Sequence, residues 1–208
     1  ARPNFSIISE ENGVENNNDK DNTWIIDPID GTVNFLHGIP HFAISLGLQR
    51  DGEMLAGVIY EPVHDEMFWA EKGQGAHLND RRIRVSGRSV MSEPLFATGI
   101  PFKGARDHPE FLRHLEAVMA VSSGVRRFGS AALDLAYVAA GRFEGFWETG
   151  LSSWDMAAGI VLVREAGGYV TEISGKKQMM KSGSILAAND LIHLPLGKLL
   201  RSTDVNNT

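Results

Sequence analysis

The chain has 208 residues, 43% of them hydrophobic, and no cysteine. This length is enough for one compact domain or a domain in two lobes with a substantial core, and the lack of cysteine excludes disulfides, thiolate metal sites and a cysteine nucleophile. The formal net charge is −6, and residues 1–49, with seven acids and two fixed cations, account for −5 of it. Such an acidic surface repels nucleic acid and phosphate unless bound cations reverse its sign, so we expect no direct binding of nucleic acid.

Membrane insertion and secretion are not expected either. No apolar run reaches the about eighteen residues that a membrane-spanning helix needs, and no signal peptide precedes the first residue, Ala1. The absence of cysteine fits a reducing compartment, and we expect a cytoplasmic protein. Because the chain starts without Met, we expect it to begin inside a longer protein.

The N-terminal half reads as a series of strands. The apolar run at residues 5–8 precedes a pair of glutamates, and the asparagine-rich residues 11–22 predict an exposed loop. The β-branched and aromatic residues 23–27 predict a strand that Pro28 stops. Residues 41–62 predict two strands around an Asp51-Gly52 turn, and residues 65–86 continue the meander with turns at 73–75 and 79–80.

The C-terminal half alternates helices with short strands, which predicts an α-plus-β pattern. Helices are predicted over 108–124, over 129–141 with Ser130 as N-cap and Gly141 at the stop, and over 152–168. Strands are predicted over 145–149, 169–173 and 184–189.

The stretch "DPIDGT", residues 27–32, is the strongest candidate site. Pro28 fixes the backbone, so that two carboxylates three residues apart, Asp27 and Asp30, can converge on one point. Oxygen ligands of this kind suit Mg²⁺, Mn²⁺ or Ca²⁺, while the amides of Gly31 and Thr32 could receive a phosphate oxygen. "DxxDG" alone is more often an ordinary Asx-turn, but the proline, the threonine and the acidic surroundings favour the metal site.

Four other acids each have two readings. Asp155 near the start of a helix is either an N-cap or a ligand; Ser152 and Ser153 could cap equally well, which leaves its carboxylate available. Ala157, Ala158 and Gly159 next to it give that helix a thin face for close packing. The Glu10-Glu11 pair and Glu148 are either solvated ends of strands or further members of an acidic site.

The remaining candidates favour structural readings. His37 and His41 are separated by Pro40 and cannot share a helix face, so zinc is not expected there. The "GQG" at 73–75 lacks the lysine and helix of a P-loop and predicts a hairpin turn. Arg81, Arg82 and Arg84 read as a solvated strand end more readily than as an anion patch.

Taken together, "SEEN", "WIIDPIDGTVNF" and "WDMAAGIVLVREAGG" resemble the inositol monophosphatase family, a group of Mg²⁺-dependent, lithium-sensitive phosphatases. The three motifs occur in the family's order, and the similarity runs through essentially the whole chain. The resemblance implies an α/β (α+β) layered sandwich of the sugar-phosphatase type with alternating α-β-α-β-α layers. We expect an N-terminal lobe over residues 1–86 and a C-terminal lobe over residues 87–208.

Family roles carry over position by position. Glu10, Asp27 and the Ile29 carbonyl would hold a first metal ion, and Asp27, Asp30 and Asp155 a second. Glu10 would also reach a third, looser ion, and Glu11 would support these ligands from behind. The residues implied to bind substrate are Asp30, Gly31, Thr32, Ala131, Glu148 and Asp155. The resemblance implies two to three Mg²⁺ ions per site as cofactors. Mn²⁺ could replace them, and Li⁺ would inhibit the activity.

The implied reaction is in-line hydrolysis of a phosphate monoester by a metal-activated water that Thr32 orients, with Asp27 and Glu10 also catalytic. Inositol-1-phosphate is the favoured substrate because the "GTVNF", "WET" and "SSWD" stretches look most like inositol monophosphatases. Fructose-1,6-bisphosphate, histidinol phosphate and 3′-phosphoadenosine 5′-phosphate stay open, as does a regulatory role among proteins of ribosomal RNA transcription and processing. A homodimer is implied.

One departure from the family concerns the start of the chain. The family begins with two helices before the Glu-Glu element, and a loop between them supplies an acid that works with the threonine on the attacking water. No residue of this sequence can be assigned to that acid.

Overall fold

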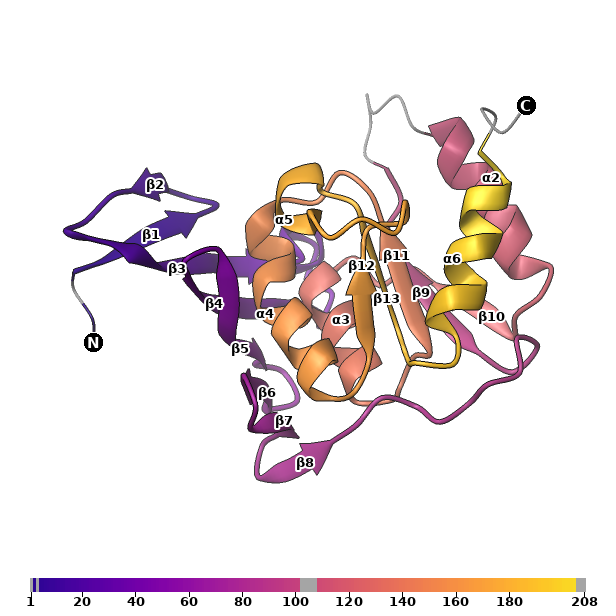
Figure 1. The fold of residues 1–208 in the computed structure, drawn as a ribbon, viewed down its shortest axis with the longest axis horizontal. Coiled ribbons are helices and arrows are strands. Elements are labelled where there is room, and N and C mark those ends of the chain that lie inside the picture. Colours follow the sequence, from indigo (N-terminus) through magenta and orange to yellow (C-terminus); the bar gives the residue numbers. More distant parts are fainter. Residues whose placement is uncertain (1, 3, 102–107, 205–208) are drawn as a thin grey trace.

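Two β-sheets and two pairs of helices alternate in layers (Figure 1). The structure is a computed structural model that describes residue 2 and residues 4–101 and 108–204. The first layer is an eight-stranded sheet, the second is a pair of central helices, the third is a five-stranded sheet and the fourth is a second helix pair. The layered α/β sandwich expected from the sequence is confirmed. In the described residues, no helix covers the outer face of the eight-stranded sheet (Figure 1).

The eight-stranded sheet comes from the N-terminal residues and has the order β2-β1-β3-β4-β5-β6-β7-β8. Its strands are β1 (Phe5–Ser9), β2 (Gly13–Glu15), β3 (Asp19–Asp30), β4 (Ala43–Arg50), β5 (Glu53–Glu61), β6 (Glu66–Glu71), β7 (Gly75–Leu78) and β8 (Arg81–Ile83). β1 and β3 run parallel and the other neighbours run antiparallel. The predicted turn between β4 and β5 is confirmed, since Asp51 and Gly52 both have positive φ, 49° and 80°, as a tight hairpin requires.

The five-stranded sheet comes from the C-terminal residues and has the order β10-β9-β11-β13-β12. Its strands are β9 (Leu95–Thr98), β10 (Gly124–Arg126), β11 (Gly145–Glu148), β12 (Tyr169–Thr171) and β13 (Ile185–Ala188). β10, β9 and β11 are parallel. Their carboxyl ends therefore meet at one edge, which brings Glu148 at the end of β11 beside Gly99 after β9. The expected lobe boundary near Ser86 falls between the two sheets and stays a prediction.

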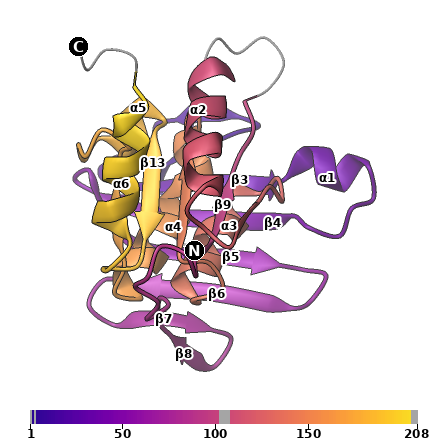
Figure 2. The same ribbon diagram turned by 90° about the vertical axis from the view of Figure 1, so that its right-hand side faces the viewer.

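The four longer helices form two pairs that take different positions relative to the sheets (Figures 1 and 2). The helices are α1 (Thr32–Leu36), α2 (His108–Met119), α3 (Ala131–Ala139), α4 (Ser153–Glu165), α5 (Met179–Ser182) and α6 (His193–Ser202). α3 and α4 lie between the sheets, whereas α2 and α6 lie side by side on the outer face of the five-stranded sheet. The short helix α1 directly follows β3 and projects from the end of the first sheet (Figure 2).

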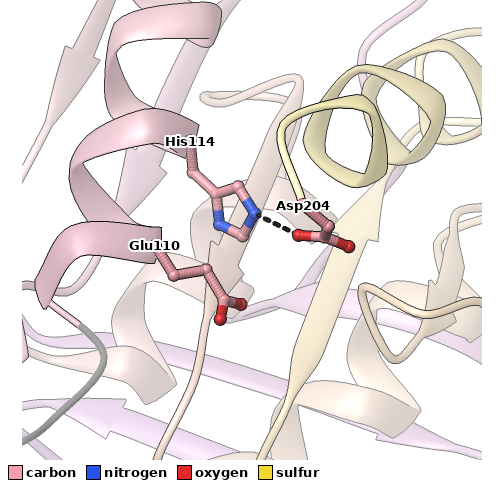
Figure 3. Close-up of side chains that lie close together, drawn as sticks. All are labelled: Glu110, His114 and Asp204. Atoms are coloured by element: carbon pink, nitrogen blue, oxygen red, sulfur yellow. Dashed lines mark ion pairs between the residues drawn. The ribbon is translucent and has the colours of Figure 1, made fainter. Parts of the chain in front are cut away.

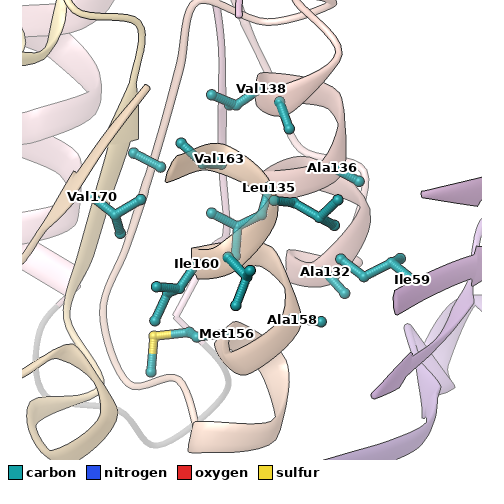
Figure 4. Close-up of a cluster of buried hydrophobic side chains, with 14 of the residues drawn as sticks. Ile59, Ala132, Leu135, Ala136, Val138, Met156, Ala158, Ile160, Val163 and Val170 are labelled. Atoms are coloured by element: carbon teal, nitrogen blue, oxygen red, sulfur yellow. The ribbon is translucent and has the colours of Figure 1, made fainter. Parts of the chain in front are cut away.

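The thin face of α4 permits the close packing that the sequence predicts. A Cβ added to Gly57 of β5 would lie 2.7 Å from the Cα of Ala158, and one added to Gly159 would overlap Leu135 of α3. Around these contacts, the apolar side chains of α3 and α4 fill the space between the sheets and reach Ile59 of the first sheet (Figure 4). A helix in direct contact with the sheet backbone leaves little room to shift, because protein interiors are close-packed.

Several predicted boundaries are wrong, each for a local reason. β3 does not stop at Pro28; it continues to Asp30 with a register shift opposite β4 between Asp27 and Asp30, and a bulge is a position where a strand tolerates proline. Residues 11–22 are not only a loop, since they contain β2 and the start of β3. The helix predicted over 108–124 ends at Met119, and Gly124 opens β10.

Candidate metal and phosphate site

Three carboxylates from distant parts of the sequence meet at the carboxyl end of β3. Asp27 and Asp30 lie in the last four residues of that strand, and Asp155 lies in the first turn of α4. One ligand oxygen of each lies within 4.8 Å of the others. The bulge after Asp27 makes this possible, because it changes the register between the two strand acids.

Asp30 is fixed from the start of α3. Its side chain is 8% exposed, and its Oδ2 accepts hydrogen bonds from the Ser130 hydroxyl and, at 2.8 Å, from the Ala132 amide. Ser130 in turn accepts a hydrogen bond from the Leu133 amide and caps α3, as predicted. The link from Ser130 to Asp30 was not predicted, because a cap residue gives no sequence signal of a second partner.

Asp27 and the residues after it form a local network. The Oδ1 atom of Asp27 accepts a hydrogen bond from the Ile29 amide at 2.9 Å, while the Ile29 carbonyl accepts one from the Thr32 hydroxyl at 2.9 Å. Asp27 is 1% exposed and Thr32 is exposed. The threonine hydroxyl is therefore held at the mouth of the site, directly beside the carbonyl implied as a metal ligand.

Ser152 is the N-cap of α4, as the sequence suggests, and Asp155 completes a capping box with it. The Asp155 Oδ2 atom accepts a hydrogen bond from the Ser152 amide at 2.7 Å, so this carboxylate helps to cap the helix and also belongs to the acidic cluster. The bond uses one of its two oxygens. The helix start thus orients the same carboxylate that meets the strand acids.

Glu10 and Glu148 both interact electrostatically with this cluster. Glu10 lies exposed in the turn after β1, where its amide donates to the Ile26 carbonyl at 3.3 Å, and its charge raises the pKa of all three clustered acids. Glu148 lies half-buried at the end of β11, and its pKa is raised to about 8, first by burial and then by Asp30 and Asp155. Glu11 is exposed in the same turn as Glu10.

The pKa of each clustered acid is raised above its ordinary value in the protein alone. Burial first and the neighbouring carboxylates second raise the pKa of Asp27 to about 8 and that of Asp155 to about 7. The pKa of Asp30 rises only to about 6, since burial raises it while the bonds from Ser130 and Ala132 lower it. Such a group can ionise together at neutral pH only when a cation compensates the charge.

A cavity of about 140 Å³ opens beside the cluster. Its lining residues are Asp30, Gly99, Arg127, Gly129, Ser130, Ala131, Asp134, Glu148, Leu151 and Asp155. Four predicted residues, Asp30, Ala131, Glu148 and Asp155, thus share one cavity. Its polar lining and its volume suit a small hydroxyl-bearing molecule.

The cavity also contains two charged residues that the sequence reasoning missed. Asp134 of α3 is 1% exposed, and its pKa is raised well above the ordinary value by burial, then by Glu148 and Asp30. The positive charge of Arg127 lowers the pKa of both Asp134 and Glu148. An acid in a predicted helix is normally expected to face solvent. The position of Asp134 in the cavity wall therefore becomes visible only from the packing of α3.

The backbone at Gly31 turns tightly between the strand and α1. Gly31 has φ 90°, and a Cβ there would lie 3.1 Å from the His41 carbonyl and 3.2 Å from the Gly129 carbonyl. The buried Asn34 donates to the carbonyls of His41 and Phe128, both at 2.8 Å, which ties α1 to the segment before α3. Only glycine fits this left-handed, crowded position without strain. The backbone that carries the exposed Thr32 is therefore held in one conformation.

The weaker candidates lie in ordinary structural settings. His41 packs its ring against Phe128 and Tyr137. The turn at 73–75 is confirmed, with positive φ at Gly73 and Gly75. The arginines at 81 and 82 lie exposed in the edge strand β8.

Comparisons with known proteins agree with this geometry. A sequence profile described as the inositol monophosphatase family matches residues 1–203. An inositol-1-monophosphatase of Mesorhizobium japonicum is 52% identical over 201 residues, which cover 97% of this chain and 76% of that protein. A protein named Nus factor SuhB from Pseudomonas aeruginosa is 46% identical over 193 residues, covering 91% of this chain and 71% of that protein.

Solved structures show the same fold. The crystal structure of the extragenic suppressor protein suhB from Bartonella henselae superposes with a TM-score of 0.93 at 50% identity. The match covers 96% of this chain and 77% of that one.

Proposed function

The chain belongs to the inositol monophosphatase family, whose members are metal-dependent hydrolases of phosphate monoesters, and on this premise we propose that it hydrolyses inositol-1-phosphate with Mg²⁺ as cofactor. The observation that carries the proposal is the convergence of Asp27, Asp30 and Asp155 within 4.8 Å beside a polar cavity of about 140 Å³. In the part of the chain that the structure describes, no helix is both long and apolar enough to cross a membrane.

The residues present fit a hard divalent cation. Their donor atoms are carboxylate oxygens and the Ile29 carbonyl, which are the ligands that Mg²⁺ and Mn²⁺ prefer. We assign Glu10, Asp27 and the Ile29 carbonyl to one ion and Asp27, Asp30 and Asp155 to a second, with a looser third ion near Glu10. Bound there, such cations supply an activated water and neutralise charge on the leaving oxygen.

The protein's own groups orient the reacting molecules. The Thr32 hydroxyl donates a hydrogen bond to the Ile29 carbonyl at 2.9 Å, which leaves the threonine oxygen as an acceptor for the attacking water. The amides of Gly31 and Thr32 would bind phosphate oxygens. Glu148 and the backbone at Ala131 line the cavity and would receive the polyol hydroxyls.

The metal requirement is tested by phosphate release from inositol-1-phosphate. We expect no activity in excess EDTA and recovery with Mg²⁺ or, in part, with Mn²⁺. Asp27→Asn should abolish the recovery, because its carboxylate serves both ions. The exposed Asp21 lies on the same strand, so Asp21→Asn serves as the matched control and should retain activity. Full activity in EDTA would contradict the proposal.

The substrate is tested with a panel of inositol-1-phosphate, fructose-1,6-bisphosphate, histidinol phosphate and 3′-phosphoadenosine 5′-phosphate. We expect the highest kcat/KM for inositol-1-phosphate. A higher kcat/KM for another member of the panel would support the hydrolase activity but contradict inositol-1-phosphate as the preferred substrate. We further propose that the protein is a cytoplasmic homodimer. Light scattering of the protein as it elutes from a size-exclusion column should give twice the mass of one chain.

A second candidate function is a regulatory role among proteins that act in ribosomal RNA transcription. It is favoured by the 46% identity to the protein named Nus factor SuhB. An Asp27→Asn variant separates the two functions. If the inactive variant still supports ribosomal RNA synthesis in cells that lack their own copy, the regulatory role does not need hydrolysis. If the parent protein itself gives no support, the regulatory role is refuted.

A further inference from the structure

A second group of possible ligands lies on the far side of the five-stranded sheet. Glu110 and His114 are four residues apart on α2 and therefore share one face of that helix. Asp204 follows the end of α6, the helix that lies beside α2 (Figures 1 and 2). The three side chains point toward one another (Figure 3), and one ligand atom of each lies within 4.8 Å of the others.

His114 is the unusual member of this group. Its side chain is 3% exposed, and its Nε2 atom has no hydrogen-bond partner in the described structure. The nearest carboxylate oxygen, Asp204 Oδ1, is 3.6 Å away, which is too long for a hydrogen bond. A buried polar atom without a partner is costly and calls for one.

The separation of 3.6 Å fits two ligands of one metal ion. Zinc binds imidazole nitrogen and carboxylate oxygen at about 2.0–2.2 Å with tetrahedral geometry, which places neighbouring ligand atoms roughly 3.3–3.6 Å apart. We propose that Glu110, His114 and Asp204 form a binding site for a divalent transition-metal ion of the zinc class, separate from the acidic cluster and joining α2 to the end of α6.

The ligand set also distinguishes this site chemically from the acidic cluster. Imidazole favours Zn²⁺, Co²⁺ or Ni²⁺ over Mg²⁺, whereas the acidic cluster offers oxygen only. A cavity of about 10 Å³ adjoins Glu110 and His114, and Glu148 of the substrate cavity lines its other part. That volume accommodates about one water molecule, which can complete a fourth position on the metal.

Cobalt spectroscopy tests the proposal. The purified protein is freed of metal, supplied with excess Mg²⁺ to occupy the acidic cluster, and titrated with Co²⁺. We expect one Co²⁺ per chain with the visible absorption of a low-coordinate nitrogen- and oxygen-ligated ion, lost when Zn²⁺ displaces it. Zn²⁺ should also raise the midpoint of thermal unfolding in the presence of Mg²⁺, because a ligand of the folded state stabilises it.

Variants locate the ion. His114→Gln should abolish the absorption, and Asp204→Asn should weaken Co²⁺ binding by about tenfold or more, since even residues that only orient metal ligands change affinity by that factor. Glu116, exposed on the same helix, gives the matched control Glu116→Gln, which should bind as the parent does. The Asp204 side chain is 44% exposed, so its variant should fold even if His114→Gln does not.

Two results would overturn the site. One is Co²⁺ binding in Asp204→Asn as tight as in Glu116→Gln, which would leave His114 and Asp204 as an ordinary ion pair. The other is loss of the absorption in Asp27→Asn, which would assign the bound ion to the acidic cluster. Neither result depends on catalytic activity, so the phosphatase proposal stands or fails separately.

Discussion

Replacing Glu148 by Gln separates substrate recognition from metal binding. Glu148 lines the cavity together with Asp30 and Asp155 but comes from the end of β11, in the other sheet from β3. Like Glu10, it is absent from the group of three acids whose oxygens lie within 4.8 Å of one another, but unlike Glu10 it lines the cavity. Its carboxylate is therefore placed for a substrate hydroxyl, and glutamine keeps the size of the side chain while removing its charge.

Cations bound at Asp30 and Asp155 would keep Glu148 ionised, although its pKa in the protein alone is raised to about 8, so the expected loss is that of one charged hydrogen bond. Such a bond contributes about 1.5–3 kcal/mol, which corresponds to roughly 10- to 150-fold in kcat/KM if it is wholly lost. Glutamine can still accept a weaker bond, so we expect a loss of up to that amount for inositol-1-phosphate. The Mg²⁺ requirement should change little, although Glu148 interacts electrostatically with Asp30 and Asp155, because its oxygens are not among the clustered ligands.

The assay compares two variants with two substrates over a Mg²⁺ titration. Glu148→Gln should impair inositol-1-phosphate hydrolysis and leave an aryl phosphate without hydroxyls nearly unaffected. Asp155→Asn should impair both substrates and raise the Mg²⁺ concentration for half-maximal activity. If Glu148→Gln raises that concentration as much as Asp155→Asn does, Glu148 binds metal and the reasoning is refuted.

The remaining predictions concern protons, packing and lithium. In EDTA, the midpoint of thermal unfolding should fall as the pH rises from 5 to 8 and Mg²⁺ should largely remove the fall, because the raised pKa values of Asp27 and Glu148, both about 8, make the folded state bind more protons than the unfolded chain over this window; a flat profile in EDTA would contradict the burial of these acids. Gly57→Ala should lower the free energy of unfolding by about 1–3 kcal/mol because its Cβ would lie 2.7 Å from Ala158 Cα, whereas Gly87→Ala, with open space around it, should change it by less than about 0.5 kcal/mol in the same urea titration. Li⁺ should inhibit at concentrations at which Na⁺ does not, since it is close to Mg²⁺ in size with half the charge; equal inhibition by the two salts would contradict lithium sensitivity.

The sequence predicts local features of the site well. "DPIDGT" carries both strand acids, the glycine and the threonine within six residues, and the periodicity around Ser130 predicts a capped helix that the structure confirms. These features depend on residues close in sequence, so that turn chemistry and capping preferences are enough to find them.

Features that depend on tertiary contacts escape the sequence. Asp134 lies in a helical pattern and becomes buried only because α3 packs between two sheets. Helix α6 was not predicted; it contains Pro195 and Gly197, residues with low helix propensity, yet proline is tolerated in a first helical turn, where the amide lacks a partner. The link between Ser130 and Asp30, 100 residues apart, has no counterpart in local pattern.

The bond between Asp155 and the Ser152 amide couples cofactor loading to local unfolding. The same carboxylate stabilises the first turn of α4 and faces the two strand acids. Its pKa of about 7 lets protons compete for it near neutral pH. A cation that fixes this side chain therefore also raises the free energy of opening at the start of the central helix, which amide hydrogen exchange measures. We therefore expect amide exchange at the start of α4 to be slowest when the metal ions are bound.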